Sequence, residues 1–247
     1  WDNYSTSQLT KKKMIRSKGY FISGTDTGIG KTVVTACLLA FYRHQGTDTG
    51  IMKPFETGVD PKCSSEANSD AKFLLEIARN QDLLEDVCPI RLKPAASPLQ
   101  AARMTNQPLD IASVIEKFRR LQNRHDQMLV EGIGGLMVPL KPNYLVSDLI
   151  KDMRLPLIIV SRIALGSINH TLLTLKAAQQ AEIEIAGIIM NRSKRGPLND
   201  IELEQTDLIH ELSGIPILGE CPFIDPISSE QFDEKLAEKI KHWKISP

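Results

Sequence analysis

Hydrophobic positions along this chain form two alternating patterns, namely short apolar runs and longer segments with helical spacing. The apolar runs predict strands over residues 20–23, 50–53, 127–131, 156–161, 185–191 and 215–220. The segments between them predict helices over residues 32–45, 70–79, 111–122, 167–181, 202–212 and 230–243. Residues 157–160 read Leu-Ile-Ile-Val without polar alternation, which is typical of a parallel strand covered on both faces.

This alternation of strands and helices predicts an α/β fold, with a doubly wound, mostly parallel sheet and helices on both faces. The sequence contains no internal repeat and no linker that would divide it, so we expect a single domain over residues 14–247. Residues 1–13 are polar and aperiodic, and we expect them to be an extension; a functional basic arm is the alternative. In such a sheet the ligand site lies at the carboxyl ends of the strands.

The overall charge argues against two classes of partner. The chain has thirty acidic and thirty basic residues among 247, so its formal net charge is zero, and we expect neither nucleic acid nor membrane as a partner. It has no apolar run of membrane-spanning length and no secretory signal, so we expect a cytoplasmic protein. Cys37, Cys63, Cys88 and Cys221 are scattered, which indicates core or incidental thiols in a reducing compartment.

Residues 24–32, with the sequence GTDTGIGKT, carry the clearest chemical signal. They lie between a predicted strand and a predicted helix, where a glycine-rich loop exposes backbone N–H groups to phosphate oxygens. Lys31 is then placed to reach the β- and γ-phosphates, and the Thr32 hydroxyl to bind Mg²⁺. Gly24 and Gly30 enclose five residues instead of the usual four. The segment predicts a nucleoside triphosphate site in a P-loop NTPase-like fold.

Charged and polar residues also follow other predicted strands. Glu131 ends an apolar strand and is followed by glycines, which favours a carboxylate that holds Mg²⁺ over a solvated one. Lys53 precedes Pro54 at a strand end and is either solvated or a second cation for a transferring phosphoryl group. Asp70 precedes a helix and, from the local pattern alone, is a cap. Ser167 begins a helix that either binds a carboxylate or is simply capped.

Several segments occur together in an order that resembles one family, the ATP-dependent dethiobiotin synthetases. They are GTDTGIGKT at 24–32, KPFETG at 53–58, NSD at 68–70, VEGIGG at 130–135, LGSINH at 165–170 and the strand that ends in Asn191. The resemblance covers residues 19–225, and the tail beyond matches poorly. It implies a homodimeric ligase of biotin biosynthesis that uses ATP and Mg²⁺. Its substrates would be 7,8-diaminopelargonate and CO₂ or bicarbonate, and its products dethiobiotin, ADP and phosphate, formed through a carbamate and a carbamic-phosphoric anhydride.

The same resemblance implies roles for individual residues. Lys31 and Lys53 would be catalytic, and the metal ligands would be Thr32, Asp70 and Glu131, which replaces the interpretation of Asp70 as a cap. The substrate would meet Thr27, Thr57, Ser167, Ile168 and Asn169, the last three at a helix N-terminus across a dimer interface. The ATP-binding residues would be Gly28, Ile29, Gly30, Lys31, Thr32, Val33, Asp70, Glu131, Gly132, Ile133, Gly134, Asn191, Arg192, Pro222, Phe223 and Ile224. Of these, Asn191 would recognise the adenine edge, and Pro222, Phe223 and Ile224 would line the base.

Two other classes of protein share parts of this pattern. Cobyrinic acid amidating synthetases have a similar ATP domain with an attached glutaminase domain, for which we expect no room and no cysteine in a nucleophile context. ParA/MinD-like nucleotide switches carry a signature lysine five residues before the phosphate-loop lysine. Here that position is Asp26, which argues against a switch.

Overall fold

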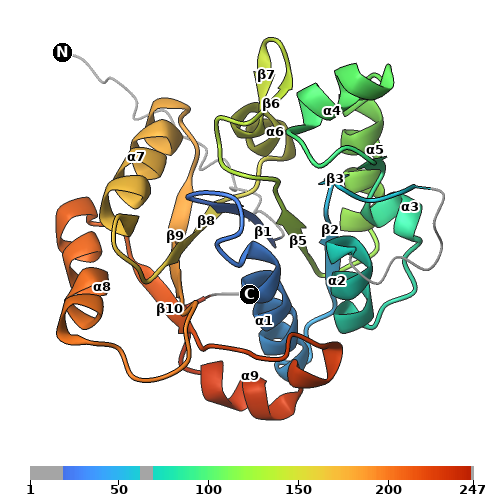
Figure 1. The fold of residues 1–247 in the computed structure, drawn as a ribbon. Helices are drawn as coiled ribbons and strands as arrows, with labels where there is room; N and C mark the ends of the chain where they lie inside the picture. Colours follow the sequence, from blue (N-terminus) through green and yellow to red (C-terminus); the bar gives the residue numbers. More distant parts are fainter. Residues whose placement is uncertain (1–18, 62–68, 246–247) are drawn as a thin grey trace, which may run out of the picture.

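The computed structural model describes residues 19–61 and 69–245. Its centre is a six-stranded sheet in the order β10-β9-β8-β1-β5-β2, and every neighbouring pair is parallel (Figure 1). The strands are β1 (Gly19–Gly24), β2 (Thr49–Met52), β5 (Gln127–Glu131), β8 (Leu157–Arg162), β9 (Ile185–Asn191) and β10 (Ile217–Cys221). The predicted doubly wound α/β fold is confirmed, and all six predicted strands belong to this sheet.

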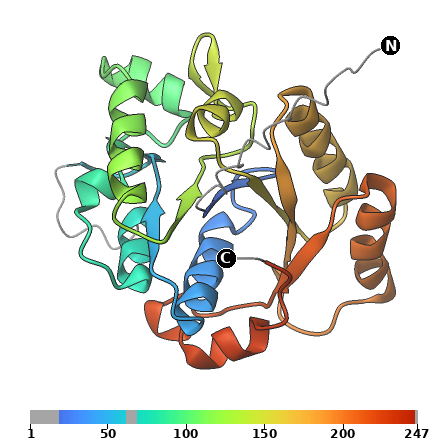
Figure 2. The same cartoon turned by 180° about the vertical axis from the view of Figure 1, so that it is seen from behind.

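Helices and two small strand pairs surround the sheet (Figures 1 and 2). The helices are α1 (Lys31–His44), α2 (Asp70–Ala78), α3 (Leu84–Val87), α4 (Pro98–Thr105), α5 (Ile111–Gln122), α6 (Val146–Met153), α7 (Ser167–Gln180), α8 (Asp200–Ser213), the 3₁₀ turn η1 (Ser229–Gln231) and α9 (Glu234–Ile240). The pairs are parallel β3 (Phe55–Thr57) with β4 (Ile90–Leu92), and antiparallel β6 (Pro139–Lys141) with β7 (Tyr144–Leu145).

Successive side chains of a strand point to opposite faces of the sheet, and helices cover both faces here. The side chains of the apolar strands are therefore buried on either face. In β5, Met128 and Val130 belong to a core that also includes side chains of α4, α5, α6, α7 and α8. Leu129, between them, belongs to the second core, with side chains of α1, α2 and α9. The continuous apolar runs of the sequence therefore reflect a sheet between two helical layers.

The C-terminal region differs from the sequence prediction. We expected one helix over residues 230–243, but the chain forms η1 and then α9. The side chain of Asp233 accepts a hydrogen bond from the Leu236 N–H at 3.0 Å, so it caps a new helix within the predicted one. Helix α8 begins at Asp200, two residues before the predicted start, because Asn199 and Glu202 form a reciprocal capping box.

Three of the four cysteines, Cys37, Cys88 and Cys221, are buried free thiols, as predicted for them. Burial raises the pKa of Cys37 and of Cys88, which makes both poor nucleophiles. Cys63 and the proposed extension over residues 1–13 lie outside the described residues. Within the described ranges, every helix is too short or too polar to cross a bilayer.

Candidate active site

A cleft of about 490 Å³ opens at the carboxyl ends of β1, β2 and β5. The loop after β1 forms one side, and α1 begins at its base with Lys31. The segment after β2 and the first residue of α2 form the opposite side. The position agrees with the general rule that open parallel sheets bind ligands where their strands end.

Two glycines give the loop its shape. Gly28 and Gly30 have φ values of +69° and +91°, which L-residues with side chains rarely adopt. A Cβ on Gly30 would lie 2.1 Å from Nδ2 of Asn191, so there is no space for a side chain. That same Nδ2 donates a hydrogen bond to the Ile29 carbonyl at 2.7 Å. Strand β9, which ends in Asn191, therefore supports the loop directly.

Lys31 lies beneath this loop and is nearly buried. Its Nζ donates to the Asp26 carbonyl at 3.0 Å, within the loop itself. Burial lowers the pKa of Lys31, and the attraction of Glu131 offsets this shift only in part. A buried ammonium with incomplete compensation is well suited to bind an anion such as a phosphate group.

Glu131 connects the loop with the opposite wall of the cleft. Its Oε1 accepts hydrogen bonds from the Thr32 hydroxyl at 2.9 Å and from Nζ of Lys53 at 2.6 Å. The whole side chain is buried, yet Oε2 has no hydrogen-bond partner among the described residues. A buried carboxylate oxygen without a partner is costly unless a ligand satisfies it.

Lys53 lies between two carboxylates. Its Nζ is 2.6 Å from Glu131 Oε1 and 3.3 Å from Asp70 Oδ2. Burial disfavours the ammonium form, but the attraction of Glu131 and then of Asp70 is larger and raises the pKa of Lys53. The side chain is therefore a fixed cation at neutral pH.

Asp70 is the first residue of α2, and the cap is Ser69, whose side chain accepts from the Lys72 N–H. The interpretation of Asp70 as a cap is therefore wrong. Its carboxylate is half exposed and faces Lys53 across the cleft. The hydroxyl of Thr32 and the carboxylates of Asp70 and Glu131 are the hard oxygen donors that Mg²⁺ prefers, and the unpartnered Glu131 Oε2 fits such an ion.

Most of the predicted site residues meet in this cleft. The ones that line it are Thr27, Gly28, Gly30, Lys31, Thr32, Val33, Lys53, Thr57, Asp70, Glu131, Gly132, Ile133 and Gly134. Ile29 is in the loop, but its side chain is part of the core that contains α1. Its contact with ATP, through the backbone, stays a prediction.

The residues predicted for the adenine base lie outside the lining of the cleft. Asn191 is buried and its amide nitrogen is engaged by Ile29, while Nε of Arg192 pairs with Glu220. Pro222, Phe223 and Ile224 follow β10 and are half buried. Their contact with the base stays a prediction.

The residues predicted for a substrate carboxylate, Ser167, Ile168 and Asn169, form the first turn of α7. The N-cap residue of this helix is Gly166, with φ +88° and no side chain that could cap, so the alternative of a plain serine cap is wrong. Ser167 is buried, Asn169 is exposed, and this turn does not line the cleft. Its role across a dimer interface stays a prediction.

Four lining residues were missed from the sequence, namely Glu56, Gly58, Val59 and Ile227. Glu56 is a buried carboxylate in β3, and Ile227, from the segment after β10, is exposed at the rim of the cleft. Glu56 belongs to the quoted KPFETG segment, so its charge could have marked it. Ile227 lies in the tail, where the pattern gives no signal.

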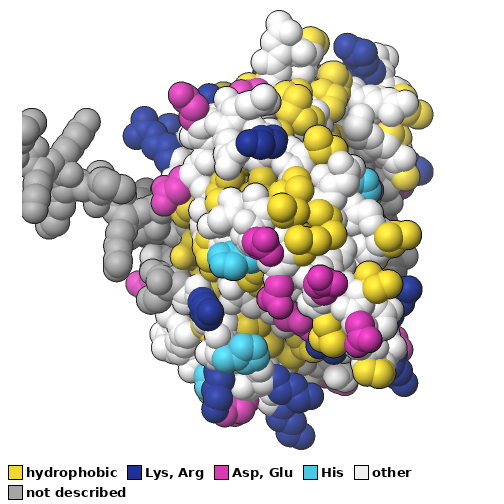
Figure 3. Space-filling view, turned by 90° about the vertical axis from the view of Figure 1, so that its left-hand side faces the viewer, with side chains coloured by type: hydrophobic (Ala, Val, Ile, Leu, Met, Phe, Trp, Pro, Cys, Tyr) yellow, Lys and Arg dark blue, Asp and Glu magenta, His cyan; other side chains and the backbone are white. Residues whose placement is uncertain are grey.

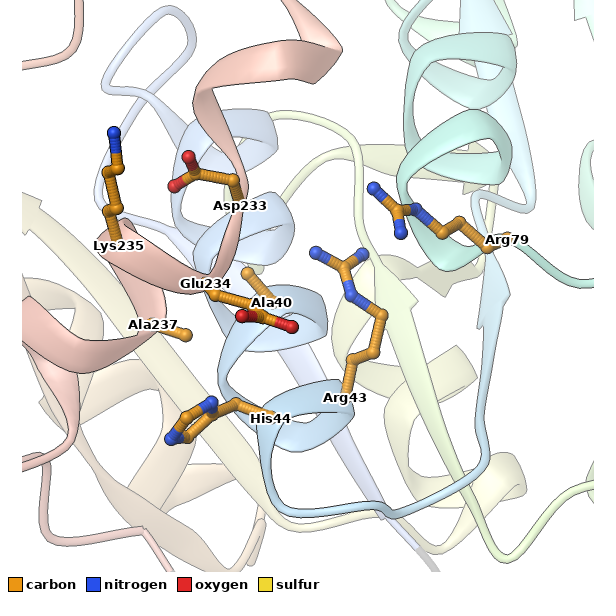
Figure 4. Close-up of a pocket in the computed structure, with 8 residues that line it drawn as sticks. All are labelled: Ala40, Arg43, His44, Arg79, Asp233, Glu234, Lys235 and Ala237. Atoms are coloured by element: carbon orange, nitrogen blue, oxygen red, sulfur yellow. The ribbon is translucent and has the colours of Figure 1, made fainter.

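A second cavity of about 560 Å³ lies at the opposite end of α1 (Figure 4). It is lined by Ala40, Arg43, His44, Arg79, Asp233, Glu234, Lys235 and Ala237. It has side chains of both charge signs, and Arg43 is bound to the Ile77 and Phe232 carbonyls. These features indicate a junction between helices rather than a nucleotide site.

Comparisons with known proteins agree with this geometry. A family model described as an AAA domain matches residues 18–231. The ATP-dependent dethiobiotin synthetase of Thermodesulfovibrio yellowstonii is 41% identical over 223 residues, covering 87% of this chain and 93% of that protein. The enzyme of the same name from Bacillus velezensis is 40% identical, covering 90% and 94%. The chain belongs to the ATP-dependent dethiobiotin synthetase family. The predicted enzyme class, a ligase, is confirmed by this membership.

Solved structures extend the likeness in fold beyond the synthetase family. The MinD protein in the MinC:MinD complex of Aquifex aeolicus is similar with a TM-score of 0.52 and 15% identity, covering 89% of this chain and 86% of that chain. This likeness confirms the P-loop NTPase-like fold but concerns the fold alone. The signature lysine of ParA/MinD-like nucleotide switches is absent here, because that position is Asp26.

Proposed function

We propose that this protein carboxylates 7,8-diaminopelargonate with CO₂ and closes the ring to dethiobiotin, with ATP converted to ADP and phosphate. The observation that supports this proposal most directly is that Lys31, Lys53 and Glu131 line one cleft next to a glycine-rich loop. Family membership supplies the reaction, and the cleft offers the groups that it needs.

The first step needs only binding and orientation. One amine of the substrate takes up CO₂ as a carbamate and loses a proton. The backbone N–H groups of the loop and Lys31 would bind the triphosphate, while Lys53 would face the anionic carbamate. Thr27 and Thr57, which line the cleft, would donate or accept hydrogen bonds at the reacting end of the substrate. Holding both reactants together removes much of the entropic cost of their encounter.

The second step is phosphoryl transfer from ATP to a carbamate oxygen. The bond between the γ-phosphorus and the bridging oxygen of ADP breaks as the new P–O bond forms. A loose transition state of this kind requires neutralised charge and alignment rather than covalent help. Lys53, with its raised pKa, is a fixed cation suited to that task, and Lys31 adds a buried ammonium beside the loop. The second amine then attacks the carbamoyl carbon and gives up a proton, the bond from that carbon to the phosphate oxygen breaks, phosphate leaves, and the ring closes.

The proposed cofactor is Mg²⁺, held by Thr32, Asp70 and Glu131. When bound, the ion would neutralise charge on the β- and γ-phosphate oxygens. The supporting observation is the buried Glu131 Oε2, which has no partner within the described residues. Within them, there is no group of three histidine, cysteine or acidic side chains for a metal. The remaining ligands would therefore be phosphate oxygens and water.

The test is product formation by the purified protein with ATP, Mg²⁺ and bicarbonate, with and without the diamine. We expect phosphate release that depends on the diamine, together with one dethiobiotin per phosphate detected by mass spectrometry. Phosphate release that is indifferent to the diamine would contradict the proposal and would favour a nucleotide switch or an amidating enzyme.

A homodimer is the second part of the proposal. Figure 3 shows hydrophobic side chains gathered on the face of α7 and α8, where Leu165, Leu173, Ile201, Leu203 and Leu212 are exposed. Exposed apolar patches of this kind mark interaction surfaces. A dimer through this face would bring the first turn of α7 toward the partner, as predicted for Ser167, Ile168 and Asn169.

Leu173→Glu tests this surface. A charge in the middle of an apolar interface should convert a dimer to a monomer, and light scattering coupled to gel filtration measures the mass directly. The matched control is Leu83→Glu, which changes an exposed leucine just before α3. A wild-type monomer, or equal dissociation by both variants, would contradict the assignment.

A further inference from the structure

Glu56 is a buried carboxylate that lines the cleft and has no part in the mechanism above. It lies in β3, three residues after Lys53. Both of its oxygens are bound to the start of α2. Oε1 accepts the Asp70 N–H at 2.5 Å, and Oε2 accepts the Ser69 hydroxyl at 2.8 Å.

These two contacts join one carboxylate to two successive residues at the start of α2. The Ser69 hydroxyl donates its proton to Glu56, and its oxygen accepts the Lys72 N–H at 3.3 Å as the cap of the helix. The Asp70 N–H is one of the first-turn donors that the helix itself cannot satisfy. Glu56 thus replaces the missing partner and determines where α2 begins.

The start of α2 determines where Asp70 points. Its backbone is held by Glu56, while its carboxylate reaches Lys53 at 3.3 Å. Lys53 and Glu56 belong to the same short segment after β2, so one short piece of chain contacts both the carboxylate and the backbone of Asp70. We propose that Glu56 is a positioning residue, which orients Asp70 toward Lys53 and the phosphate groups. The proposal rests on the proposed function, since that function gives Asp70 its role.

Charged and polar groups of the adjoining elements surround Glu56. Lys53 and Asp70 face it from the adjoining segments, Cys88 Sγ lies 3.9 Å from Oε2, and Arg91 is opposite on β4. Burial raises the pKa of Glu56, although the bond from Ser69 and the attraction of Lys53 oppose the shift.

The first experiment compares Glu56→Gln with the wild-type chain. A glutamine has one acceptor oxygen and so loses at least one of the two contacts. We expect kcat to fall about tenfold and the half-saturating Mg²⁺ concentration to rise, with KM for ATP within about threefold. The matched control is Glu116→Gln, which removes the same charge from the exposed side of α5. It should leave all three values unchanged.

A double-mutant cycle with Asp70→Asn separates positioning from general structural support. If Glu56 acts through Asp70, adding Glu56→Gln to Asp70→Asn should lower kcat by less than about twofold more. A further tenfold loss in the Asp70→Asn protein would show that Glu56 acts independently and would overturn the proposal. An unchanged kcat in Glu56→Gln alone would overturn it as well.

Two further arms keep the result interpretable. If Glu56→Gln does not fold, Ser69→Ala replaces it in the cycle. This variant removes the contact to Oε2 together with the cap contact to the Lys72 N–H, and it keeps the contact between Oε1 and the Asp70 N–H. If the wild-type chain forms no dethiobiotin, the proposed function fails. The same variants are then compared by the Mg²⁺-dependent binding of a fluorescent ATP analogue. If the losses in binding free energy of the two single variants add up in the double variant, the positioning role is overturned as well.

Discussion

Lys31 and Lys53 are both buried beside Glu131, yet their pKa values move in opposite directions. Lys53 contacts two carboxylates, and their attraction outweighs its burial. Lys31 makes its hydrogen bond to a backbone carbonyl, so burial is the larger effect. One lysine is therefore satisfied by the protein, whereas the other needs an anionic ligand.

Replacing Lys53 should impair turnover more than binding. Lys53→Met removes a cation that is expected to act on the transferring phosphoryl group, so kcat should fall about 10²- to 10³-fold. The Kd for ATP should change by no more than about threefold, because Lys31 and the loop remain. Steady-state rates and calorimetric titration measure the two quantities. Equal losses in both would assign Lys53 to nucleotide binding instead.

Replacing Lys31 should stabilise the free protein while it abolishes ATP binding. The lowered pKa of Lys31 means that the unfolded chain holds this proton more tightly, so the buried ammonium costs stability at neutral pH. Lys31→Met should therefore melt at a higher temperature than the wild type without nucleotide. As pH rises from the lowered pKa toward about 10.4, the ordinary lysine value, the wild type loses the proton and the difference should narrow. Thermal melts from pH 7 to 10 check the sign, and a Tm below that of the wild type would contradict it.

The phosphate loop is an element in which sequence and tertiary contacts reinforce each other. Its glycines adopt positive φ angles, and Asn191 from the end of β9 binds the Ile29 carbonyl. The loop is therefore held by a strand that lies two positions away from β1 in the sheet, beyond β8. A substitution on either side of this contact should displace the backbone N–H groups that are expected to bind the phosphates.

Gly30→Ala should disrupt this contact. The new Cβ would lie 2.1 Å from Asn191 Nδ2, in a backbone conformation with φ +91°. We expect ATP affinity to fall at least about tenfold, since the backbone N–H groups of the loop must shift. The matched control is Gly46→Ala at the other end of α1, which has φ +75° but nothing within 4 Å of its Cβ. It should cost about 1 kcal/mol in stability and leave affinity intact. Equal affinities for both variants would contradict the role of the contact.

The sequence predicted the elements whose signals are local. The apolar runs identified the six strands of the central sheet, and the glycine spacing identified the phosphate loop. Contacts made by folding were not visible in the pattern. Glu56 meets Ser69 and Asp70 only because β3 packs beside the start of α2, across 13 and 14 residues. A short strand pair such as β3 and β4 depends on residues far apart in the chain, so local spacing does not predict it.

At the scale of the whole molecule, the segment after β10 packs against the cleft and against α2. Ile227 reaches the rim of the cleft, and the Phe232 ring packs edge-on against Phe73 of α2 at 5.5 Å between centroids. Arg43, near the end of α1, donates to the Ile77 carbonyl at 2.7 Å and to the Phe232 carbonyl at 2.5 Å. The guanidinium of Arg43 thus connects three segments that are distant in sequence.

Arg43→Met should therefore lower stability without changing the chemistry. Two carbonyls lose charged donors, and with a discount for partial exposure we expect the free energy of unfolding to fall by about 2 kcal/mol. For a chain of this size that corresponds to a Tm lower by about 4–8 °C. Below the transition, kcat should stay within about twofold, because Arg43 lies at the end of α1 opposite to Lys31.

Arg79→Met provides the comparison, since Arg79 lines the same cavity and its side chain makes no hydrogen bond or ion pair within the described residues. Arg79 also repels Arg43, which adds to the effect of burial in lowering the pKa of Arg43. Its removal should change stability by less than about 0.5 kcal/mol. Denaturant unfolding curves give the free energy of unfolding of both variants for this comparison. Equal losses would mean that the cavity acts through its overall charge. A loss confined to Arg43→Met would show that its two carbonyl contacts hold the C-terminal segment against α1 and α2.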